Sequence, residues 1–361
     1  MKKIHRALIG CGRIGFLLEN DPLRYKPCTH YGGSLAAGLP VTCACDIDAE
    51  RLDKFSKTAG IPREYCFAGH TELLETMRPE IVIIATWTDS HEEICVHAAR
   101  NGARVIVLEK PVAPTLAGAE RIIRECSTAG AVPVINHERR YDSRYRKLKS
   151  LLDKGKIGRV KTVNARMLTA GHRGASSPGQ GGGPLLHDGT HLVDIIRFLF
   201  GDITTVTGEF TRESRTSGYE DRAAAWLKTE SGIDIFLEAG GSRSYFVFEL
   251  EISGTEGRVI IGNGYERLYT GRKSKLYTGF RDLEETDFPS FRSTNCFTEL
   301  YRESGRLRKS RNTIPISTGR DGMKALEVIH AVYLSSHLNR QEISLPIDPG
   351  EIDLNTIFSI S

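Results

Sequence analysis

Long apolar segments are absent from this chain of 361 residues, and no run approaches the ~20 apolar residues that a membrane-spanning helix needs. A secretory signal is not expected either, because Met1–Lys3 leads directly into a first apolar strand. The eight cysteines form no C-x-x-C pair, which argues against a disulfide framework and against a structural zinc site. These features predict a cytoplasmic protein that binds no membrane and no metal.

A strong net charge is also missing. The net charge is +4, and the short basic run Arg302–Arg311 has no interleaved aromatic side chains. We therefore expect no nucleic-acid partner. Hydrophobic residues make up 40% of the chain and charged residues 26%, which is typical of a globular protein with a sizeable core. The length favours two domains.

A glycine-rich turn follows the first apolar strand. Ile4–Ile9 runs into Gly10-Cys11-Gly12-Arg13-Ile14-Gly15, and a strand followed by G-x-G-x-x-G is the fingerprint of a dinucleotide-binding turn. The first glycine permits the sharp turn, the second lets the backbone approach a pyrophosphate, and the third lets a helix pack closely on the strand. We predict a helix over Arg13–Leu18 and cofactor contacts from Gly10, Cys11, Gly12, Arg13, Ile14 and Gly15.

A carboxylate ends the second apolar strand. Asp46 follows Pro40–Cys45, where it would bond the adenosine ribose hydroxyls and repel the extra phosphate of NADP, so NAD is the predicted cofactor. The alternative is a turn carboxylate or a helix cap before Ala49–Lys57. Asp46 lies farther from the glycines than usual because of a polar insertion, Glu19–Tyr31. This insertion is either a surface loop or a segment that reaches the binding cleft through Tyr25, Lys26 or His30.

The pattern of elements predicts the fold class. Apolar strands alternate with amphipathic helices up to Asn136, which indicates a parallel sheet covered on both faces. From Ile203 to about Tyr277, strands of alternating character follow one another, which indicates an antiparallel sheet with one exposed face. We predict an α/β protein with an N-terminal Rossmann doubly wound parallel sheet in residues 1–136. An α+β domain with a large, mostly antiparallel sheet would follow in residues 137–361.

Polar segments follow the carboxyl ends of the predicted parallel strands, where open sheets of this kind bind ligands. They are Ala85–His91, Glu109-Lys110-Pro111 and Asn136–Tyr141. Lys110 comes directly after the apolar run Val105–Leu108, and a lysine there is costly to desolvate unless it has a partner or a task. It either stabilises a developing alkoxide on the substrate or forms a simple ion pair with Glu109.

A second polar cluster lies at the start of a helix predicted over Leu185–Phe200. Helical spacing places His187, His191 and Asp194 on one face, with Asp188 also one turn from His191. A histidine with an acidic neighbour is a natural general base. Metal binding ranks below this because no third ligand is evident, and the plainest alternative is that Asp188 caps a helix with ordinary histidines.

Together these residues resemble the glucose–fructose oxidoreductase / inositol dehydrogenase (Gfo/Idh/MocA) family. The resemblance covers nearly the whole chain and rests on the glycine turn, Asp46, Glu109-Lys110-Pro111, Arg139–Asp142 and the Gly181–Gly183 … His191-x-x-Asp194 segment. It implies an NAD(P)-dependent oxidoreductase of sugars, cyclitols and their derivatives. It also implies that Lys110 is the active-site lysine and His191 the catalytic base. Cofactor contacts are then expected from Thr86, Trp87, His91, Glu109 and Lys110, with Arg139 near the nicotinamide or substrate.

The sequence departs from the family at one position. Many members carry aspartate four residues before the histidine, whereas this chain has His187 there and Asp188 one residue later. On a helix this is a rotation of about 100°. His187 and Asp188 therefore join His191 as catalytic and substrate-binding candidates.

The resulting hypothesis is an NAD-dependent oxidoreductase that transfers hydride between nicotinamide and a secondary alcohol or ketone of a polyol. Two alternatives are an NAD-retaining lyase or glycosidase with transient oxidation, and a non-catalytic sugar sensor. We also expect a homodimer or homotetramer built through the exposed face of the Ile203–Tyr277 sheet.

Overall fold

The computed structural model describes residues 4–169, 182–212, 218–310, 313–348 and 354–359. Its contacts divide the chain into two compact units. The first consists of Met1–Asp142 and Ser293–Lys324, and the second of Ser143–Arg292 and Ala325–Ser361. This division differs from the predicted boundary after residue 136, because Ser293–Lys324 groups with the first unit.

The first unit contains a parallel sheet of six strands in the order β3-β2-β1-β4-β5-β6, which is the order of a doubly wound dinucleotide-binding domain. The central strands β4 and β5 are buried at every residue, as expected for strands covered on both faces. The strands are β1 (Arg6–Ile9), β2 (Cys43–Cys45), β3 (Cys66–Phe67), β4 (Ile81–Ile84), β5 (Val105–Leu108) and β6 (Val132–Ile135).

The helices of this unit begin and end at recognisable signals. Asp48 caps α2 by accepting bonds from two backbone amides, and Gly60 ends it with a φ of 65°. Thr115 caps α5, and Gly130 ends it with a φ of 70°. The helices are α1 (His30–Ala36), α2 (Ala49–Ala59), α3 (His70–Met77), α4 (His91–Arg100), α5 (Leu116–Ala129) and α9 (Cys296–Lys309), with the 3₁₀ turns η2 (Arg63–Tyr65), η3 (Thr88–Ser90) and η4 (Glu138–Tyr141).

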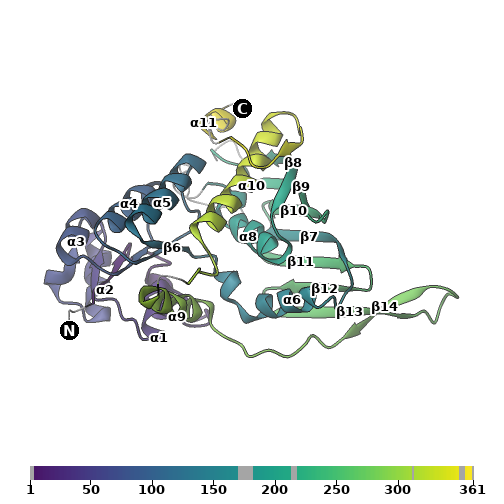
Figure 1. Cartoon of the computed structure of the whole chain (residues 1–361), viewed down its shortest axis with the longest axis horizontal. Helices are drawn as coiled ribbons and strands as arrows, with labels where there is room; N and C mark the ends of the chain where they lie inside the picture. The colour runs from purple at the N-terminus through teal and green to yellow at the C-terminus, as the bar shows by residue number, and fades with distance from the viewer. Residues whose placement is uncertain (1–3, 170–181, 213–217, 311–312, 349–353, 360–361) are drawn as a thin grey trace. The chain divides into compact units, whose positions relative to one another are not determined.

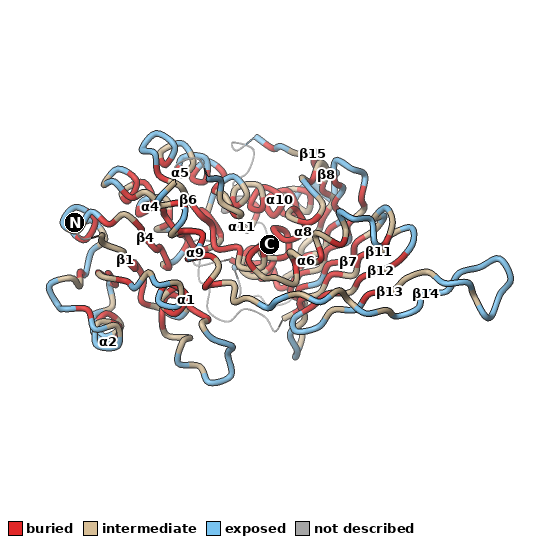
Figure 2. Tube along the Cα trace, turned by 60° about the horizontal axis from the view of Figure 1, so that its bottom comes forward, coloured by how far each residue is buried: buried red, intermediate tan, exposed pale blue. Residues whose placement is uncertain are grey.

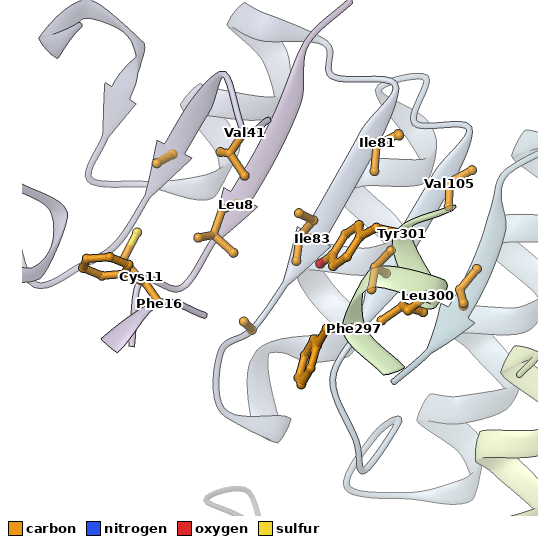
Figure 3. Packing of buried hydrophobic residues seen from close by; sticks show 14 of the residues in the cluster. Leu8, Cys11, Phe16, Val41, Ile81, Ile83, Val105, Phe297, Leu300 and Tyr301 are labelled. Atoms are coloured by element: carbon orange, nitrogen blue, oxygen red, sulfur yellow. The ribbon is translucent and has the colours of Figure 1, made fainter. Parts of the chain in front are cut away.

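Helix α9 completes the core of the first unit although it comes from a distant part of the sequence. Its buried Phe297, Leu300 and Tyr301 belong to the same apolar cluster as Leu8 and Ile83 of the sheet, and Figure 3 shows them packed over the strands. The described part of the basic run, Arg302–Ser310, is therefore largely the outer side and last turn of an amphipathic helix, and Arg311 lies outside the described residues.

The helix predicted over Arg13–Leu18 is wrong. This stretch forms one irregular turn and the 3₁₀ helix η1 (Leu17–Asn20). The amides of His30 and Tyr31, at the start of α1, donate to the carbonyls of Ile14 and Gly15, both at 3.0 Å. In an unbroken helix those carbonyls would bond residues 18 and 19. The insertion thus interrupts the expected helix, and α1 continues it.

The second unit contains a nine-stranded sheet in the order β14-β13-β12-β11-β7-β10-β9-β8-β15. All pairs are antiparallel except β7 with β10. The fold class predicted from the sequence is confirmed. The strands are β7 (Val160–Leu168), β8 (Ile203–Thr211), β9 (Arg222–Thr229), β10 (Asp234–Gly240), β11 (Val247–Gly254), β12 (Gly257–Gly262), β13 (Tyr265–Lys273), β14 (Arg281–Thr286) and β15 (Ile343–Ser344).

Helices cover one face of this second sheet (Figure 1). Buried and accessible residues alternate along β9, as in a strand with one face on the core, and Figure 2 shows the buried residues within the sheet. The helices are α6 (Ser143–Asp153), α7 (Pro184–His187), α8 (Gly189–Phe200), α10 (Gly319–His337), which belongs to this unit from Ala325 on, and α11 (Leu354–Ser359). Among the described helices, none is long and apolar enough to cross a membrane.

Candidate cofactor and catalytic sites

The first candidate site lies at the carboxyl edge of the six-stranded sheet. Strands β1, β4 and β5 are parallel neighbours, so the residues that follow them reach the same edge of the sheet. These are the glycine turn after β1, Ala85–His91 after β4, and Glu109-Lys110 after β5. The segments that follow β4 and β5 therefore lie at one edge of the sheet together with the glycine turn, as the sequence predicts.

At two of the three glycines, Gly10 and Gly15, a side chain would clash with the protein backbone. Gly10 has a φ of 94°, and a Cβ there would lie 2.6 Å from the carbonyl oxygen of Ala85. A Cβ on Gly15 would overlap the Gly10 carbonyl. Gly12 is different, because a Cβ there would meet only the Arg51 guanidinium, at 3.6 Å. The fold does not require glycine at position 12, which fits a turn shaped for close approach of a phosphate.

Some backbone amides of the glycine turn donate to protein acceptors, and others are available to a ligand. The Cys11 amide donates to Asp46 Oδ2 at 2.7 Å, and the Cys11 thiol is buried. Arg13 is exposed and Ile14 half-buried. Within the part of the chain that the structure describes, their amides donate to no protein acceptor. They are therefore free to bond an anionic oxygen, and the residues present fit a dinucleotide pyrophosphate.

Asp46 joins the glycine turn to the end of β2. Its carboxylate accepts from the Cys11 amide and, at 2.8 Å, from the Asp48 amide. Asp48, not Asp46, caps α2, so the helix-cap alternative is wrong for Asp46. Each carboxylate oxygen has a second lone pair, so Asp46 can still accept a bond from a ribose hydroxyl.

His91 connects the loop after β4 to the loop after β5. Its ring is fully buried, with Nδ1 2.9 Å from the Pro111 carbonyl oxygen and Nε2 3.3 Å from the Thr86 carbonyl oxygen. Burial lowers the pKa of His91 against the opposing effect of these two carbonyls. Of the predicted cofactor residues in this loop, His91 holds the backbone in place, whereas Trp87 is exposed and the Thr86 hydroxyl accepts from Ser90 at 2.8 Å.

Glu109 is a buried carboxylate next to Lys110. Its Oε1 lies 2.8 Å from His30 Nε2 and accepts from Asn136 Nδ2 at 2.5 Å, while Oε2 accepts from the Lys110 amide at 3.3 Å. Burial raises the pKa of Glu109, but His30, Lys110 and Asn136 outweigh it and lower the value to about 2. Glu109 therefore interacts with Lys110 and with residues from two other segments, so the simple Glu109–Lys110 pair is only part of the arrangement.

The insertion Glu19–Tyr31 contributes His30 to the surroundings of Glu109. Tyr25 is exposed, whereas the His30 ring is fully buried against Phe297 and Tyr301 of α9. Its Nδ1 lies 2.7 Å from the Tyr301 hydroxyl. The sequence suggested His30 as one of three possible residues. Tyr301 was missed because it lies in a segment with no clear pattern.

Arg139 and its neighbours lie after β6. Arg139 donates to Glu138 at 3.1 Å. Arg140 donates to the Ile316 carbonyl at 2.9 Å and to Asp321 at 3.1 Å. It thus binds Ser293–Lys324, the later of the two chain segments that form this unit. Of the two arginines, Arg139 is therefore the one that stays a substrate-site candidate.

The second candidate site belongs to the other unit. The predicted helix Leu185–Phe200 is two helices, α7 and α8, that meet at Asp188. Asp188 makes no side-chain cap, so the capping alternative is not observed. His187, Asp188 and His191 are half-buried, and His187 Nε2 lies 3.9 Å from Asp188 Oδ1. Asp194 lies three residues after His191 in α8 and is buried.

Sequence reasoning missed Glu220, which lies against α7. Its buried Oε1 accepts from the Leu185 amide and from the Tyr333 hydroxyl, both at 2.9 Å. Oε2 is also buried and has no hydrogen-bond partner among the described residues. Burial, with a smaller effect from Asp221, raises the pKa of Glu220 to about 7 against the opposing bonds. No pattern in the segment before β9 marks this residue, because its environment depends on contacts with α7 and α10.

Glu220→Gln tests this carboxyl through the pH dependence of stability. The folded state holds a proton on Glu220 that the unfolded chain releases near its ordinary value of 4.5, so stability is present at low pH and is lost as pH rises toward about 7. The free energy of unfolding of the wild type should therefore fall by about 3 kcal/mol over this pH range because of Glu220, and this fall should be absent in Glu220→Gln. Denaturant unfolding from pH 4.5 to 8 measures it, with Glu230→Gln as an exposed control from the same unit. An unchanged pH profile in Glu220→Gln would contradict the assignment.

Comparison with protein families supports both units. Residues 4–137 match the model described as "Oxidoreductase family, NAD-binding Rossmann fold". Residues 145–260 match the GFO/IDH/MocA C-terminal domain. Together the two matches cover most of the chain.

Individual proteins agree with the family match. The chain is 28% identical over 358 residues to a D-apiose dehydrogenase of Paraburkholderia graminis, covering 94% of this chain and 89% of that protein. It is 30% identical over 261 residues to an inositol 2-dehydrogenase of Salmonella typhimurium, covering 70% of this chain and 71% of that one. The fold is similar to the WlbA dehydrogenase of Bordetella pertussis, solved with NADH and UDP-GlcNAcA, with a TM-score of 0.76, 21% identity, and coverage of 96% and 100%.

Proposed function

This chain belongs to the Gfo/Idh/MocA oxidoreductase family, and we propose that it oxidises a secondary hydroxyl of a sugar, cyclitol or related polyol with NAD as hydride acceptor. The substrate class is supported by the relatives named apiose and inositol dehydrogenases. The observation that carries the proposal is Lys110, which follows Glu109 at the sheet edge that also bears the glycine turn.

The roles of the chain's own residues follow from their chemistry. NAD, when bound, supplies the carbon that accepts the hydride. Gly12, Arg13 and Ile14 bind its pyrophosphate, and Asp46 bonds the ribose and disfavours a 2′-phosphate. Lys110 donates a hydrogen bond to the substrate oxygen and stabilises the alkoxide that develops there.

The second unit supplies the base in this proposal. His191 removes the hydroxyl proton, since its side chain is half-buried and imidazole is a common general base. His187, Asp188 and Arg139 bind the substrate hydroxyls. His187 stands where many family members carry aspartate, so it is the residue we expect to set substrate preference.

Substitutions in the glycine turn test the cofactor assignment. Gly12→Ala is expected to weaken NAD binding at least about tenfold with little change in melting temperature, because its Cβ meets little protein. Asp46→Ser should narrow the preference for NAD over NADP, chiefly by weakening NAD. Calorimetric titration with both dinucleotides measures these effects, and Gly69→Ala, with open space around its Cβ, is the control. Tight NAD binding by Gly12→Ala, or equal wild-type affinities for NAD and NADP, would contradict the assignment.

Kinetics of Lys110→Ala and His191→Ala test the mechanism on any polyol that the wild-type protein oxidises. Lys110→Ala should lower kcat far more than it weakens NAD binding. His191→Ala should lower kcat by about 10²–10⁴-fold and remove the acidic limb of the pH–rate profile.

Exposed residues of the same types serve as controls, Lys57→Ala in the first unit and His337→Ala in the second. Near-normal turnover by His191→Ala with an unchanged pH profile would shift the role of base to His187 or Asp188. Bound NAD with turnover of substrate but no accumulation of NADH would instead favour the lyase or glycosidase alternative.

We propose a homodimer or homotetramer formed through the uncovered face of the nine-stranded sheet. Trp226 of β9 and Phe236 of β10 are 47% and 48% exposed and stack with ring centroids 6.3 Å apart. Light scattering at micromolar concentration should give a dimer or tetramer mass, and Trp226→Asp should reduce it to the monomer. A monomeric wild-type protein would contradict the proposal, and Tyr25→Asp, at an exposed aromatic of the first unit, is the control.

A cytoplasmic location completes the proposal. All eight cysteines are free thiols, including Cys95 and Cys126, whose sulfur atoms lie 3.7 Å apart. Such a set of unpaired thiols fits a reducing compartment, and fractionation of the source cells tests this location.

A further inference from the structure

A buried chain of polar side chains leads from α9 to Lys110. The Tyr301 hydroxyl lies 2.7 Å from His30 Nδ1, and His30 Nε2 lies 2.8 Å from Glu109 Oε1. Tyr301 and His30 have no exposed surface, and Glu109 is 6% exposed. Lys110 follows Glu109 directly and donates its amide to the other carboxylate oxygen. These residues come from three separate parts of the sequence.

The chemistry of the end groups sets the direction of the hydrogen bonds. An ionised carboxylate only accepts, so His30 must carry hydrogen on Nε2 and donate it to Glu109. In the neutral imidazole, Nδ1 is then an acceptor, and the Tyr301 hydroxyl donates to it. Tyr301 therefore fixes the tautomer of His30, and His30 fixes the orientation of the Glu109 carboxylate.

We propose that His30 and Tyr301 are positioning residues that hold Glu109 as an oriented anion and thereby hold the Lys110 ammonium in place for its work on the substrate oxygen. This inference rests on the proposed role of Lys110 and adds two residues to it. Neither residue touches the substrate in this scheme. Both act through Glu109.

The surroundings of Glu109 explain why such support is needed. An isolated carboxylate in a protein interior is costly, and it takes up a proton unless donors compensate. The groups that face Glu109 are His30 from α1, Asn136 after β6, Tyr301 from α9, His91 from α4, and Lys110 on its own loop. His30 is the largest of the effects that oppose burial. Without it we expect Glu109 to become neutral within the working pH range and to lose its hold on Lys110.

Another tyrosine provides a matched comparison. Tyr141 is also fully buried and donates to a glutamate, Glu303 of α9, at 2.7 Å. The Glu303 carboxylate also accepts a hydrogen bond from the Ile316 amide at 3.1 Å. Tyr141→Phe thus removes a similar buried phenol bond from the same unit without interrupting the chain to Glu109.

The kinetic test compares Tyr301→Phe and His30→Gln with Tyr141→Phe. We expect the first two to lower kcat about tenfold or more toward low pH, where Glu109 takes up a proton. Their acid limb should then fall with two protonations, of His191 and of Glu109, where that of Tyr141→Phe falls with one. NAD affinity and KM should change little. In a Glu109→Gln background, adding His30→Gln should cause no further loss, because both changes act through one carboxylate.

A second measurement does not depend on activity. Histidine labelled with ¹⁵N should report the Nε2–H tautomer for His30. The ¹³C carboxyl signal of Glu109, assigned by its loss in Glu109→Gln, should titrate at markedly higher pH in Tyr301→Phe and His30→Gln than in the wild type. Tyr141→Phe should match the wild type, and melting temperatures check that each variant is folded.

The results separate the failure of this inference from the failure of the proposed function. If Tyr301→Phe and His30→Gln leave the Glu109 titration and the kcat profile as Tyr141→Phe does, the inference is overturned. An Nδ1–H tautomer of His30 would also overturn it. If the wild-type protein oxidises no polyol but the Glu109 titration shifts as expected, the proposed substrate class fails while the support of Glu109 by His30 stands.

Discussion

A buried, ionised carboxylate constrains much of the first unit. Glu109 must be compensated by donors, because the cost of an unpaired charge in a protein interior exceeds the stability of most single interactions. The compensation comes from His30 of α1, Asn136 after β6 and Lys110 on the same loop. The insertion and α9 can therefore be understood as parts of one arrangement, in which α9 supplies the packing surface and hydroxyl that His30 needs.

The insertion also shows how local irregularity is stabilised. Glu19 closes the loop by accepting from the Cys28 amide at 3.1 Å and the Thr29 hydroxyl at 2.6 Å. Asn295, the cap of α9, donates to the Pro27 carbonyl at 2.8 Å. The three residues before His30 are thus held by Glu19 and by the start of α9, and such support helps the His30 ring to orient another group.

The sequence predicts those features that depend on local chemistry. Gly10 and Gly15 are where a sharp turn and close packing require glycine, and the parallel and antiparallel sheets follow from their hydrophobic periodicity. The helix predicted over Arg13–Leu18 could not be placed correctly from the sequence. The insertion interrupts it, and the amides that bond the Ile14 and Gly15 carbonyls come from the start of α1. Tyr301 could not be linked to His30, since their contact spans 271 positions and no periodic signal joins them.

Two buried glutamates illustrate how opposite environments adjust one type of side chain. Glu109 receives bonds from His30 and Asn136, and its pKa falls to about 2. Glu220 receives bonds from a backbone amide and a phenol, and its pKa rises to about 7 because these bonds do not offset burial and the nearby Asp221 carboxylate. Each lies beside a segment that carries a proposed catalytic residue, Lys110 in one unit and His187 of α7 in the other. An ionised carboxylate suits the neighbouring lysine, and a carboxyl that holds its proton below about pH 7 adds no buried charge beside the histidine segment in that range.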